Sequence, residues 1–395
     1  MLQASYQKIL KNEFKTADFV FLKLVVAILQ SIKQVNLEKL ANALPIGIKF
    51  ESRRRRLQRF LVLPNLTIEQ VWYPILSMLI STYFQNNKII YLAIDRTNWG
   101  LVNILMISII WDKRAIPVYF ELLPKLGSSN IEEQKGIISK IIPLFETYKL
   151  CILGDREFCS ISLAKWLWER DLLFCLRVKK SCFVEVSNEI WVELNQIGLK
   201  PGTSIFYQGV RITKSKGFQP MNLVCQWKRK IKGVAPDEGW FLVTNFDNLE
   251  SAVLAYKQRF DIEEMFRSQR RAGVPPVEAT GVDFKSGGYN LEDTNASQKR
   301  LVSLIILISI AYTSATLQGK TIKQKGIQEY VCRPKEPGRQ IRRHSSFYVG
   351  IYAQTWVDFK YKCADLVVEL MKFNRNKWKF YRKGERAMKL IESTL

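Results

Sequence analysis

Two acidic residues, Asp95 and Asp155, each come directly after a short apolar segment. The segments Ile89–Ile94 and Leu150–Leu153 are rich in β-branched and aliphatic residues, which predicts strands, so each carboxylate would project from a strand end. Two such ends side by side would offer the oxygen ligands that suit Mg²⁺ or Mn²⁺ together with a substrate phosphate. Cleavage of a phosphodiester between two metal ions requires a third acid.

A predicted helix over residues 249–271 offers that acid. Tyr256, Arg259, Glu263 and Arg270 lie at offsets of 3, 7 and 14 residues from the first of them. At about 100° per residue they fall within roughly 60° of one another, on one narrow helix face. A solvated face with ion pairs explains the same pattern equally well.

Periodicity alone does not single out Glu263 on this helix, because Asp261 and Glu264 are close enough to compete with it for the metal. Other chemistries are easier to exclude. The chain has one histidine, His344, which removes Ser-His-Asp and Cys-His catalysis and histidine-rich zinc sites. It also lacks a G-x-G-x-x-G or Walker-type loop. Carboxylates with metal ions therefore remain the leading hypothesis.

The bulk composition indicates a polyanionic partner. The chain has 395 residues with 60 Lys and Arg against 36 Asp and Glu, a net charge of +24. Nucleic acid is the expected partner, because binding to a membrane surface would require a hydrophobic anchor or a basic amphipathic helix in the chain. The longest apolar segment, Leu301 to Tyr312, is short of the roughly 20 residues that cross a bilayer and predicts a buried helix.

The cysteines and the N-terminus indicate the compartment. Seven cysteines occur without any C-x-x-C pair, which fits reduced thiols, and no export signal is visible at the N-terminus. We therefore expect a cytoplasmic protein.

The N-terminal part predicts helices, with apolar residues at helical spacing in Phe19–Leu29 and Leu37–Leu44. Ser52 is a candidate N-terminal cap for a helix whose first turns carry five closely spaced arginines. The order is that of a helix-turn-helix DNA-binding motif: a short helix, a turn near Pro45 and an arginine-rich helix. The alternative interpretation is that the arginines form a solvated charged face of the helix. The predicted DNA-end contacts are Arg53, Arg54, Arg55, Arg56 and Arg59.

The elements around the two acids predict the order β-β-β-α-β-α-β, an α/β sheet of mixed direction with the layout of a ribonuclease-H-like core. The remaining predicted elements are the strands 101–110, 116–122 and 172–178 and the helices 131–148 and 161–169. Short strands separated by Gly and Pro follow up to residue 244, and helix returns at 249 and again at 292.

This pattern divides the chain into five parts. They are a helical DNA-binding domain (1–85), the first part of the core (86–180), an inserted β-rich domain (181–245), the second part of the core with the third-acid helix (246–319), and a basic, partly helical C-terminal region (320–395) that is a candidate for dimerisation.

Three sequence blocks, in order along the chain, resemble the motifs of bacterial insertion-sequence DDE transposases that carry the Tyr-Arg-Glu-Lys motif. The blocks are Ile94-Asp-Arg-Thr-Asn-Trp99, Gly154-Asp-Arg-Glu-Phe158 and the set Tyr256, Arg259, Glu263 and Arg270. Arg270 departs from the pattern, since a guanidinium fork replaces a lysine point charge. The spacing from Tyr256 and Arg259 selects Glu263 over its acidic neighbours. The arginine-rich helix, the inserted β-domain and the apolar helix after Asn290 extend the resemblance over most of the chain.

The resemblance implies a ribonuclease-H-like core in which Asp95 bridges two Mg²⁺ ions while Asp155 and Glu263 each hold one. Tyr256, Arg259 and Arg270 would grip the DNA backbone beside the cut. Similar enzymes join 3′-hydroxyl ends to target DNA through a hairpin intermediate and act as homodimers on paired terminal inverted repeats.

A flipped base stacks on an aromatic side chain in that branch of the family. Trp240 is near the matching place, and Trp99 is a weaker candidate. A role for Trp240 as an ordinary core or sheet-surface residue is about as well supported. Two other readings of the whole chain also stay open, namely a metal-dependent nuclease without strand transfer and a catalytically decayed DNA-binding relative.

Overall fold

The computed structural model describes residues 2–85, 88–112, 114–187, 189–213, 221–229, 238–259, 289–335, 344–373 and 375–395. The chain divides into two compact units. The helical unit comprises Met1–Leu76 and Phe266–Leu395, and the sheet unit comprises Ser77–Met265. Each predicted site falls within one unit or outside the described residues.

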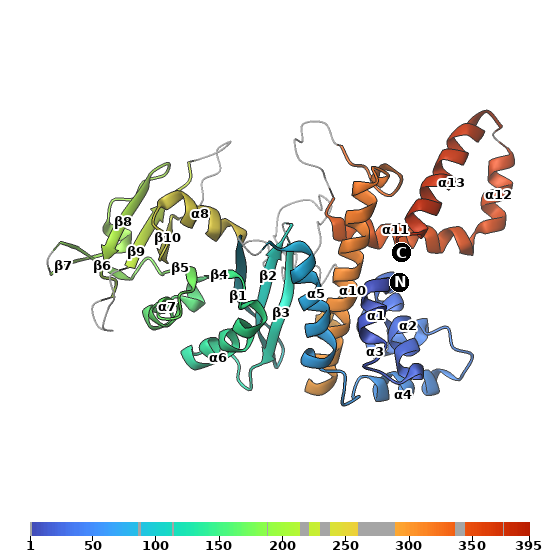
Figure 1. Ribbon diagram of the computed structural model, residues 1–395, viewed down its shortest axis with the longest axis horizontal. Coiled ribbons are helices and arrows are strands. Elements are labelled where there is room, and N and C mark those ends of the chain that lie inside the picture. Colours follow the sequence, from blue (N-terminus) through green and yellow to red (C-terminus); the bar gives the residue numbers. More distant parts are fainter. Residues whose placement is uncertain are drawn as a thin grey trace. The chain divides into compact units, whose positions relative to one another are not determined.

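The sheet unit is built on an eight-stranded mixed sheet with the order β3-β2-β1-β4-β5-β10-β9-β8 (Figure 1). The pairs β1–β4 and β4–β5 are parallel and the other pairs are antiparallel. Its strands are β1 (Ile89–Trp99), β2 (Val102–Trp111), β3 (Arg114–Leu122), β4 (Lys149–Gly154), β5 (Leu173–Arg177), β8 (Ser204–Val210), β9 (Met221–Gln226) and β10 (Trp240–Thr244). An α/β fold of mixed direction is therefore confirmed.

Part of the segment predicted as an inserted β-domain belongs to this sheet, because β8, β9 and β10 continue it beyond β5. In the described residues only β6 (Phe183–Ser187) and β7 (Ile190–Glu193) pair as a separate two-stranded sheet.

The helices of the sheet unit begin at residues suited to capping. Asn130 forms a capping box with Glu133, and Ser160 and Asn248 each accept a backbone N–H. The helical elements here are α5 (Tyr73–Tyr83), which crosses from the helical unit, α6 (Ile131–Ile141), η2 (Ile142–Phe145), η3 (Arg156–Phe158), α7 (Ile161–Trp168), η4 (Leu194–Gln196) and α8 (Leu249–Gln258).

Several predicted boundaries were wrong. The helix predicted over 249–271 ends at Gln258, and the long helix predicted to begin at 292 begins at Gln298. Strand β1 continues past Ile94 to Trp99, because its last residues still pair with β2, from Asp95 opposite Met106 to Trp99 opposite Val102. The helix predicted to reach Tyr148 ends at Ile141 and tightens into η2, where Pro143 has no N–H to continue the α-helical ladder.

The helical unit combines N-terminal and C-terminal segments. Its elements are α1 (Ala4–Leu10), α2 (Thr16–Ile32), α3 (Leu37–Ala43), α4 (Phe50–Phe60), η1 (Ile68–Trp72), η5 (Leu291–Asp293), α10 (Gln298–Gln324), η6 (Gln328–Tyr330), α11 (Ser346–Lys362), α12 (Ala364–Lys372), η7 (Arg375–Lys377) and α13 (Trp378–Glu392). The proposed cap at Ser52 was wrong, since α4 begins at Phe50 and Ser52 lies inside its first turn.

Helix α10 is the core of the helical unit and packs against α2 and α11. The prediction of a buried helix at Leu301 to Tyr312 is confirmed, with Ile305 to Ile308 fully buried. By length and hydropathy α10 would suffice to cross a membrane, but 94% of its most apolar 18-residue window is buried in the structure. The Tyr6 hydroxyl donates to Thr313 Oγ1 at 3.0 Å and ties the N-terminal helices to it.

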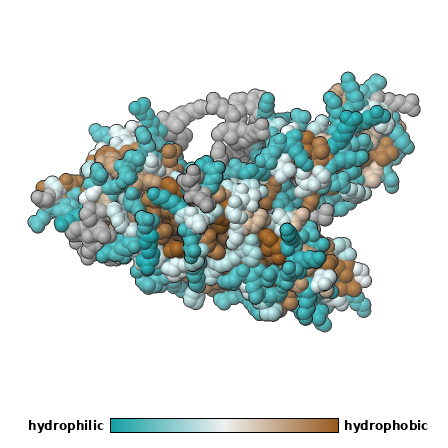
Figure 2. Space-filling view, in the orientation of Figure 1, coloured by the Kyte–Doolittle hydropathy of each residue, from teal (hydrophilic) through white to brown (hydrophobic). Residues whose placement is uncertain are grey.

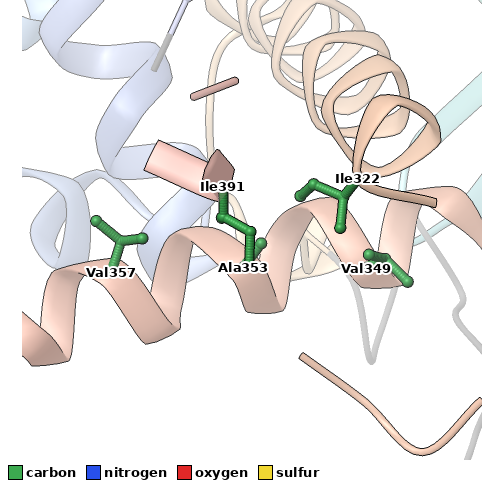
Figure 3. Close-up of a cluster of buried hydrophobic side chains, with 5 residues drawn as sticks. All are labelled: Ile322, Val349, Ala353, Val357 and Ile391. Atoms are coloured by element: carbon green, nitrogen blue, oxygen red, sulfur yellow. The ribbon is translucent and has the colours of Figure 1, made fainter. Parts of the chain in front are cut away.

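Helices α10 and α11 cross at two glycines. A Cβ added at Gly350 would lie 1.9 Å from the Ala315 carbonyl oxygen, and one added at Gly319 would lie 1.8 Å from that of Ser346. Beyond the crossing, side chains of α10, α11 and α13 meet in an apolar cluster (Figure 3), made of Ile322, Val349, Ala353, Val357 and Ile391.

Candidate active site

The two predicted acids lie in one row on neighbouring parallel strands, Asp95 within β1 and Asp155 directly after β4. The ladder between β1 and β4 ends with Ile94 opposite Gly154, so Asp95 and Asp155 are the next residues on adjoining strands. Adjacent strands are about 4.8 Å apart, which brings the two carboxylates to the same edge of the sheet. Both side chains are partly exposed.

Strand register puts both acids on the face that α8 covers. The Cys175 thiol on β5 donates to the Ala252 carbonyl of α8 at 3.6 Å, so this face of β5 looks toward α8. Leu153 pairs with Cys175, and Ala93 pairs with Leu153. Because side chains alternate along a strand, Asp95 and Asp155 point toward the same side.

The glycine before Asp155 is required by close packing behind the acid. A Cβ at Gly154 would lie 2.8 Å from Phe158 Cβ and 3.0 Å from Leu176 Cδ2. The Asp155 carboxylate itself accepts the Glu157 backbone N–H at 2.9 Å, which starts the short η3 turn. The Gly-Asp-Arg-Glu-Phe block is thus a tightly packed strand-end turn that presents one carboxylate.

An ion pair between the two motif blocks joins the acid-bearing strand ends. Arg96 Nε lies 2.8 Å and 2.9 Å from the two carboxylate oxygens of Glu157. Ser129 adds its N–H and hydroxyl to Glu157 Oε1, both at 3.0 Å, and Arg96 also donates to Asn103 Oδ1 at 3.1 Å. Both charged side chains are about 15% exposed, so the pair is largely desolvated. Neither residue was predicted from the sequence to have a role, although each belongs to one of the motif blocks.

Arg177 continues the row of acids on a third parallel strand. Leu176 is opposite Gly154, so the next residues on these two strands, Arg177 and Asp155, are neighbours. Asp155 and Asp95 are neighbours in the same way. Alternation from Cys175 points Arg177 to the α8 face as well. Arg177 was not predicted as a site residue from the sequence. The sequence feature that could have identified it is its position near the end of the predicted strand 172–178.

The motif residues of α8 meet Arg177 at this face. Tyr256 is fully buried and Arg259 is 4% exposed. Burial raises the pKa of Tyr256, while Arg259 and Arg177 act in the opposite direction and Arg259 hydrogen-bonds to the phenol. Tyr256 is therefore a neutral phenol at neutral pH and suits hydrogen-bond donation rather than proton abstraction.

A carboxylate balances part of this positive charge. Arg177 Nη2 lies 2.7 Å from Glu238 Oε1, and Arg156, the residue after Asp155, pairs with the same oxygen. Burial lowers the pKa of Arg177, and the nearby Arg156 and Arg259 add to that effect while Tyr256 opposes it. The arrangement concentrates cationic donors beside the acids.

Trp240 lies next to this group. Its ring is 5.2 Å from that of Tyr256, edge to face, and Lys228 Nζ is 4.8 Å from the Trp240 ring centre. The side chain is partly exposed at the start of β10. The other aromatic candidate, Trp99, ends β1, four residues beyond Asp95.

The third expected acid cannot be placed, because Glu263 and Arg270 lie outside the described residues, as do Asp261 and Glu264. In the part of the chain that is described, no group of three or more His, Cys, Asp and Glu side chains is arranged to hold a metal ion. The described site supplies two carboxylates, a donor set that suits a hard cation.

The arginines of α4 that were predicted to bind DNA ends fall into two groups that make different contacts. Arg53 donates to the Leu44 carbonyl at 2.9 Å, Arg54 pairs with Glu51, and Arg56 lies 4.8 Å from the centre of the Phe21 ring. Each of these three is engaged by the helical unit itself. By contrast, Arg55 and Arg59 line a pocket beside α10.

Comparisons with known proteins give distant likenesses. No family model matches the chain. The DNA replication and repair protein RecF of Flavobacterium johnsoniae is 27% identical over 103 residues, 26% of this chain and 28% of that protein. The chain thus spans under a third of the length of this curated relative.

Two solved structures are similar over larger parts of the chain. A piggyBac transposase synaptic complex with hairpin DNA covers 89% of this chain and 73% of its own, at 15% identity and a TM-score of 0.43. The Marinitoga piezophila Argonaute with 5′ OH guide RNA and target DNA covers 53% and 30%, at 12% identity and a TM-score of 0.22. Similarity at this level assigns neither fold family nor activity, so the function is argued from the chain's own residues.

Proposed function

We propose that this protein is a DDE transposase, which cuts DNA at the ends of a mobile element and joins the 3′-hydroxyl ends to target DNA. The observation that carries the proposal is the row formed by Asp95, Asp155 and Arg177 on three neighbouring parallel strands, with Tyr256 and Arg259 close to Arg177. Two carboxylates and several cationic donors at one sheet edge suit phosphoryl transfer on a polyanion.

The sheet that carries this row is proposed to be a ribonuclease-H-like core. Strands β1, β2 and β3 form an antiparallel meander, and β4 and β5 follow in parallel on the other side of β1. The helices α6 and α7 precede β4 and β5 in the chain, which reproduces the order predicted from the sequence.

The metal site is proposed to consist of Asp95, Asp155 and Glu263 around two Mg²⁺ ions, with Mn²⁺ as a substitute. Bound there, the ions would lower the pKa of the attacking water or 3′-hydroxyl and neutralise charge on the phosphate. The residues of the chain would hold that phosphate in line. A histidine base is not required by such a site.

The cationic group beside the acids would bind the DNA backbone. Arg177 and Arg259 can each give charge-assisted hydrogen bonds to phosphate oxygens, and the neutral Tyr256 phenol can add another. Arg177 is already partly exposed, whereas Tyr256 and Arg259 are buried and must be uncovered before a phosphate can reach them. Arg270 is proposed to belong to the same grip.

A hairpin intermediate would need an aromatic surface for the extruded base, and Trp240 is the proposed one. Its partly exposed ring lies against Tyr256, at the edge of the cationic group.

Action on two paired ends would require two copies of the chain, and α12 is the proposed contact between them. None of its residues is buried, and apolar side chains are exposed over the C-terminal helices (Figure 2). Leu366 and Leu370 are 68% and 67% exposed. A patch of this kind marks an interaction surface.

The proposal is tested by DNA cleavage and strand transfer with the inverted repeats that flank the gene. With Mg²⁺ the intact protein should nick and join such DNA, and Asp95→Asn, Asp155→Asn and Glu263→Gln should each abolish both steps. Binding of the same DNA should persist, because the lost carboxylates are metal ligands.

The acids next to Glu263 provide the matched controls. Asp261→Asn and Glu264→Gln change the same charge on the same segment and should retain activity. Strand transfer that survives in Asp95→Asn or Asp155→Asn would refute the assignment, and cleavage without joining by the intact protein would indicate a nuclease.

A further inference from the structure

A basic pocket lies between α4 and the start of α10 in the helical unit. It has a volume of about 530 Å³ and is lined by Ser52, Arg55, Gln58, Arg59, Val62 and Arg300. Ligand pockets commonly have volumes of roughly 300–1,000 Å³. Three of the six lining residues are arginines and none is acidic, so the chemistry of the pocket selects an anion.

The lining arginines differ from the other arginines of α4 in what they contact. Arg54 is held by Glu51 and Glu38, and Arg56 packs over Phe21. Arg55 also bonds to Glu51, at 3.0 Å, but its side chain is 71% exposed and extends to the pocket. The helix thus uses some arginines to dock on its own unit and directs others into the pocket.

Arg300 contributes an unsatisfied donor from the other wall. Its Nε is buried and has no hydrogen-bond partner among the described residues. A buried N–H of a charged group without an acceptor costs free energy, about 1–3 kcal/mol or more. An anion seated in the pocket would supply that acceptor.

The two walls are fastened to each other. The Ser303 hydroxyl of α10 donates to the Leu61 carbonyl, just past the end of α4, at 2.8 Å, and the bond is buried. Ser303 is one turn beyond Arg300, so this bond fixes the distance between Arg300 and the arginines of α4. The pocket is therefore part of the folded unit.

We propose that this pocket is a phosphate seat for the backbone of double-stranded DNA, in which Arg59 and Arg300 grip one phosphate and Arg55 a neighbouring one. The inference rests on the proposed function and deepens it by naming where the DNA-end domain holds its substrate. An open pocket with arginines on two helices fits a continuous backbone, since guanidinium forks bind phosphate oxygens bidentately. The net charge of +24 adds attraction from a distance.

The experiment measures binding of a fluorescein-labelled DNA duplex of arbitrary sequence to the full chain at several salt concentrations. Backbone contacts carry no sequence information, so no terminal repeat is needed. Arg300→Gln and Arg59→Gln should each reduce the slope of log K against log salt by up to about 0.9, the value for one phosphate contact. That corresponds to binding roughly eightfold weaker at 0.1 M salt when compared with a 1 M reference.

Lys299→Gln is the matched control, because it removes one charge from an exposed residue next to Arg300 that does not line the pocket. Its slope should stay close to that of the intact protein. Arg300→Lys should recover part of the slope, since charge is kept and the fork is lost. Unchanged thermal melting would show that the variants fold.

The inference is overturned if Arg300→Gln and Arg59→Gln bind like Lys299→Gln, or if the intact protein does not bind duplex DNA. Excess inorganic phosphate should weaken DNA binding by the intact protein and by Lys299→Gln, because the free ion competes with DNA for the pocket. The absence of this competition in Arg300→Gln would support the proposed phosphate site. The proposed catalytic function is tested by a different result: it is refuted if DNA cleavage and joining persist in variants that lack Asp95 or Asp155.

Discussion

The sheet unit and the helical unit both gather arginines for an anion, but they position them by different means. In the sheet unit Arg177 is fixed by strand register, one residue beyond the pair Leu176 and Gly154. In the helical unit Arg59 and Arg300 line one pocket, and a side-chain hydrogen bond from Ser303 to Leu61 ties α10 to the end of α4. Register is a local backbone property, whereas this contact joins segments far apart in the sequence.

Helix packing in the helical unit is most easily broken at another contact, the crossing of α10 and α11. Gly350→Ala would push a methyl group into the Ala315 carbonyl, which is fixed backbone. We expect a loss of about 3 kcal/mol or more in the free energy of unfolding, at or above the upper end for an overpacked core. Urea unfolding should show that the helical unit is destabilised. Gly384→Ala in α13, where a Cβ meets nothing within 4 Å, should instead stabilise by about 0.5–1 kcal/mol.

The sheet unit should be most sensitive at the ion pair between the motif blocks. Glu157→Ala leaves the largely buried Arg96 without its carboxylate, and we expect a loss of about 2–3 kcal/mol, below the 3–5 kcal/mol of fully buried pairs. Denaturant titration would measure it. Glu132→Ala removes an exposed partner of Lys135 and should cost under about 0.5 kcal/mol. Equal losses in the two variants would mean that Arg96 and Glu157 do not fasten the strand ends.

The cationic residue of the acid row should affect the rate of the reaction. Arg177→Gln is expected to lower the rate of DNA cleavage about 10- to 100-fold, about 1.4–2.7 kcal/mol in activation free energy, because a donor to the reacting phosphate is lost. Metal binding should not change. Arg211→Gln, which removes an exposed partner of Glu185, serves as the control. A wild-type cleavage rate in Arg177→Gln would remove this residue from the site.

The sequence predicted the parts that depend on local pattern. The segments before Asp95 and Asp155 are rich in aliphatic residues, which predicted strands, and register then placed the acids side by side. Arg177 could not be assigned in that way, because its role depends on β5 lying beside β4 and on α8 covering that face.

The arginines of α4 illustrate the same limit. Their clustering predicted that all five contact DNA ends, but Arg53 and Arg56 are engaged by Leu44 and Phe21, which lie elsewhere in the chain. Arg300 was not anticipated, because it is more than two hundred residues from α4 in sequence and joins it only through packing.

The central claim, that Asp95 and Asp155 together hold the catalytic metal, is tested most directly by Mn²⁺ binding measured with electron paramagnetic resonance. We predict that Asp95→Asn and Asp155→Asn each weaken Mn²⁺ binding by roughly tenfold or more, about 1.4 kcal/mol. Asp112→Asn should bind as the intact protein does, since Asp112 is an exposed turn residue with φ of 50° that asparagine also tolerates. Unchanged Mn²⁺ affinity in both Asp95→Asn and Asp155→Asn would contradict the claim.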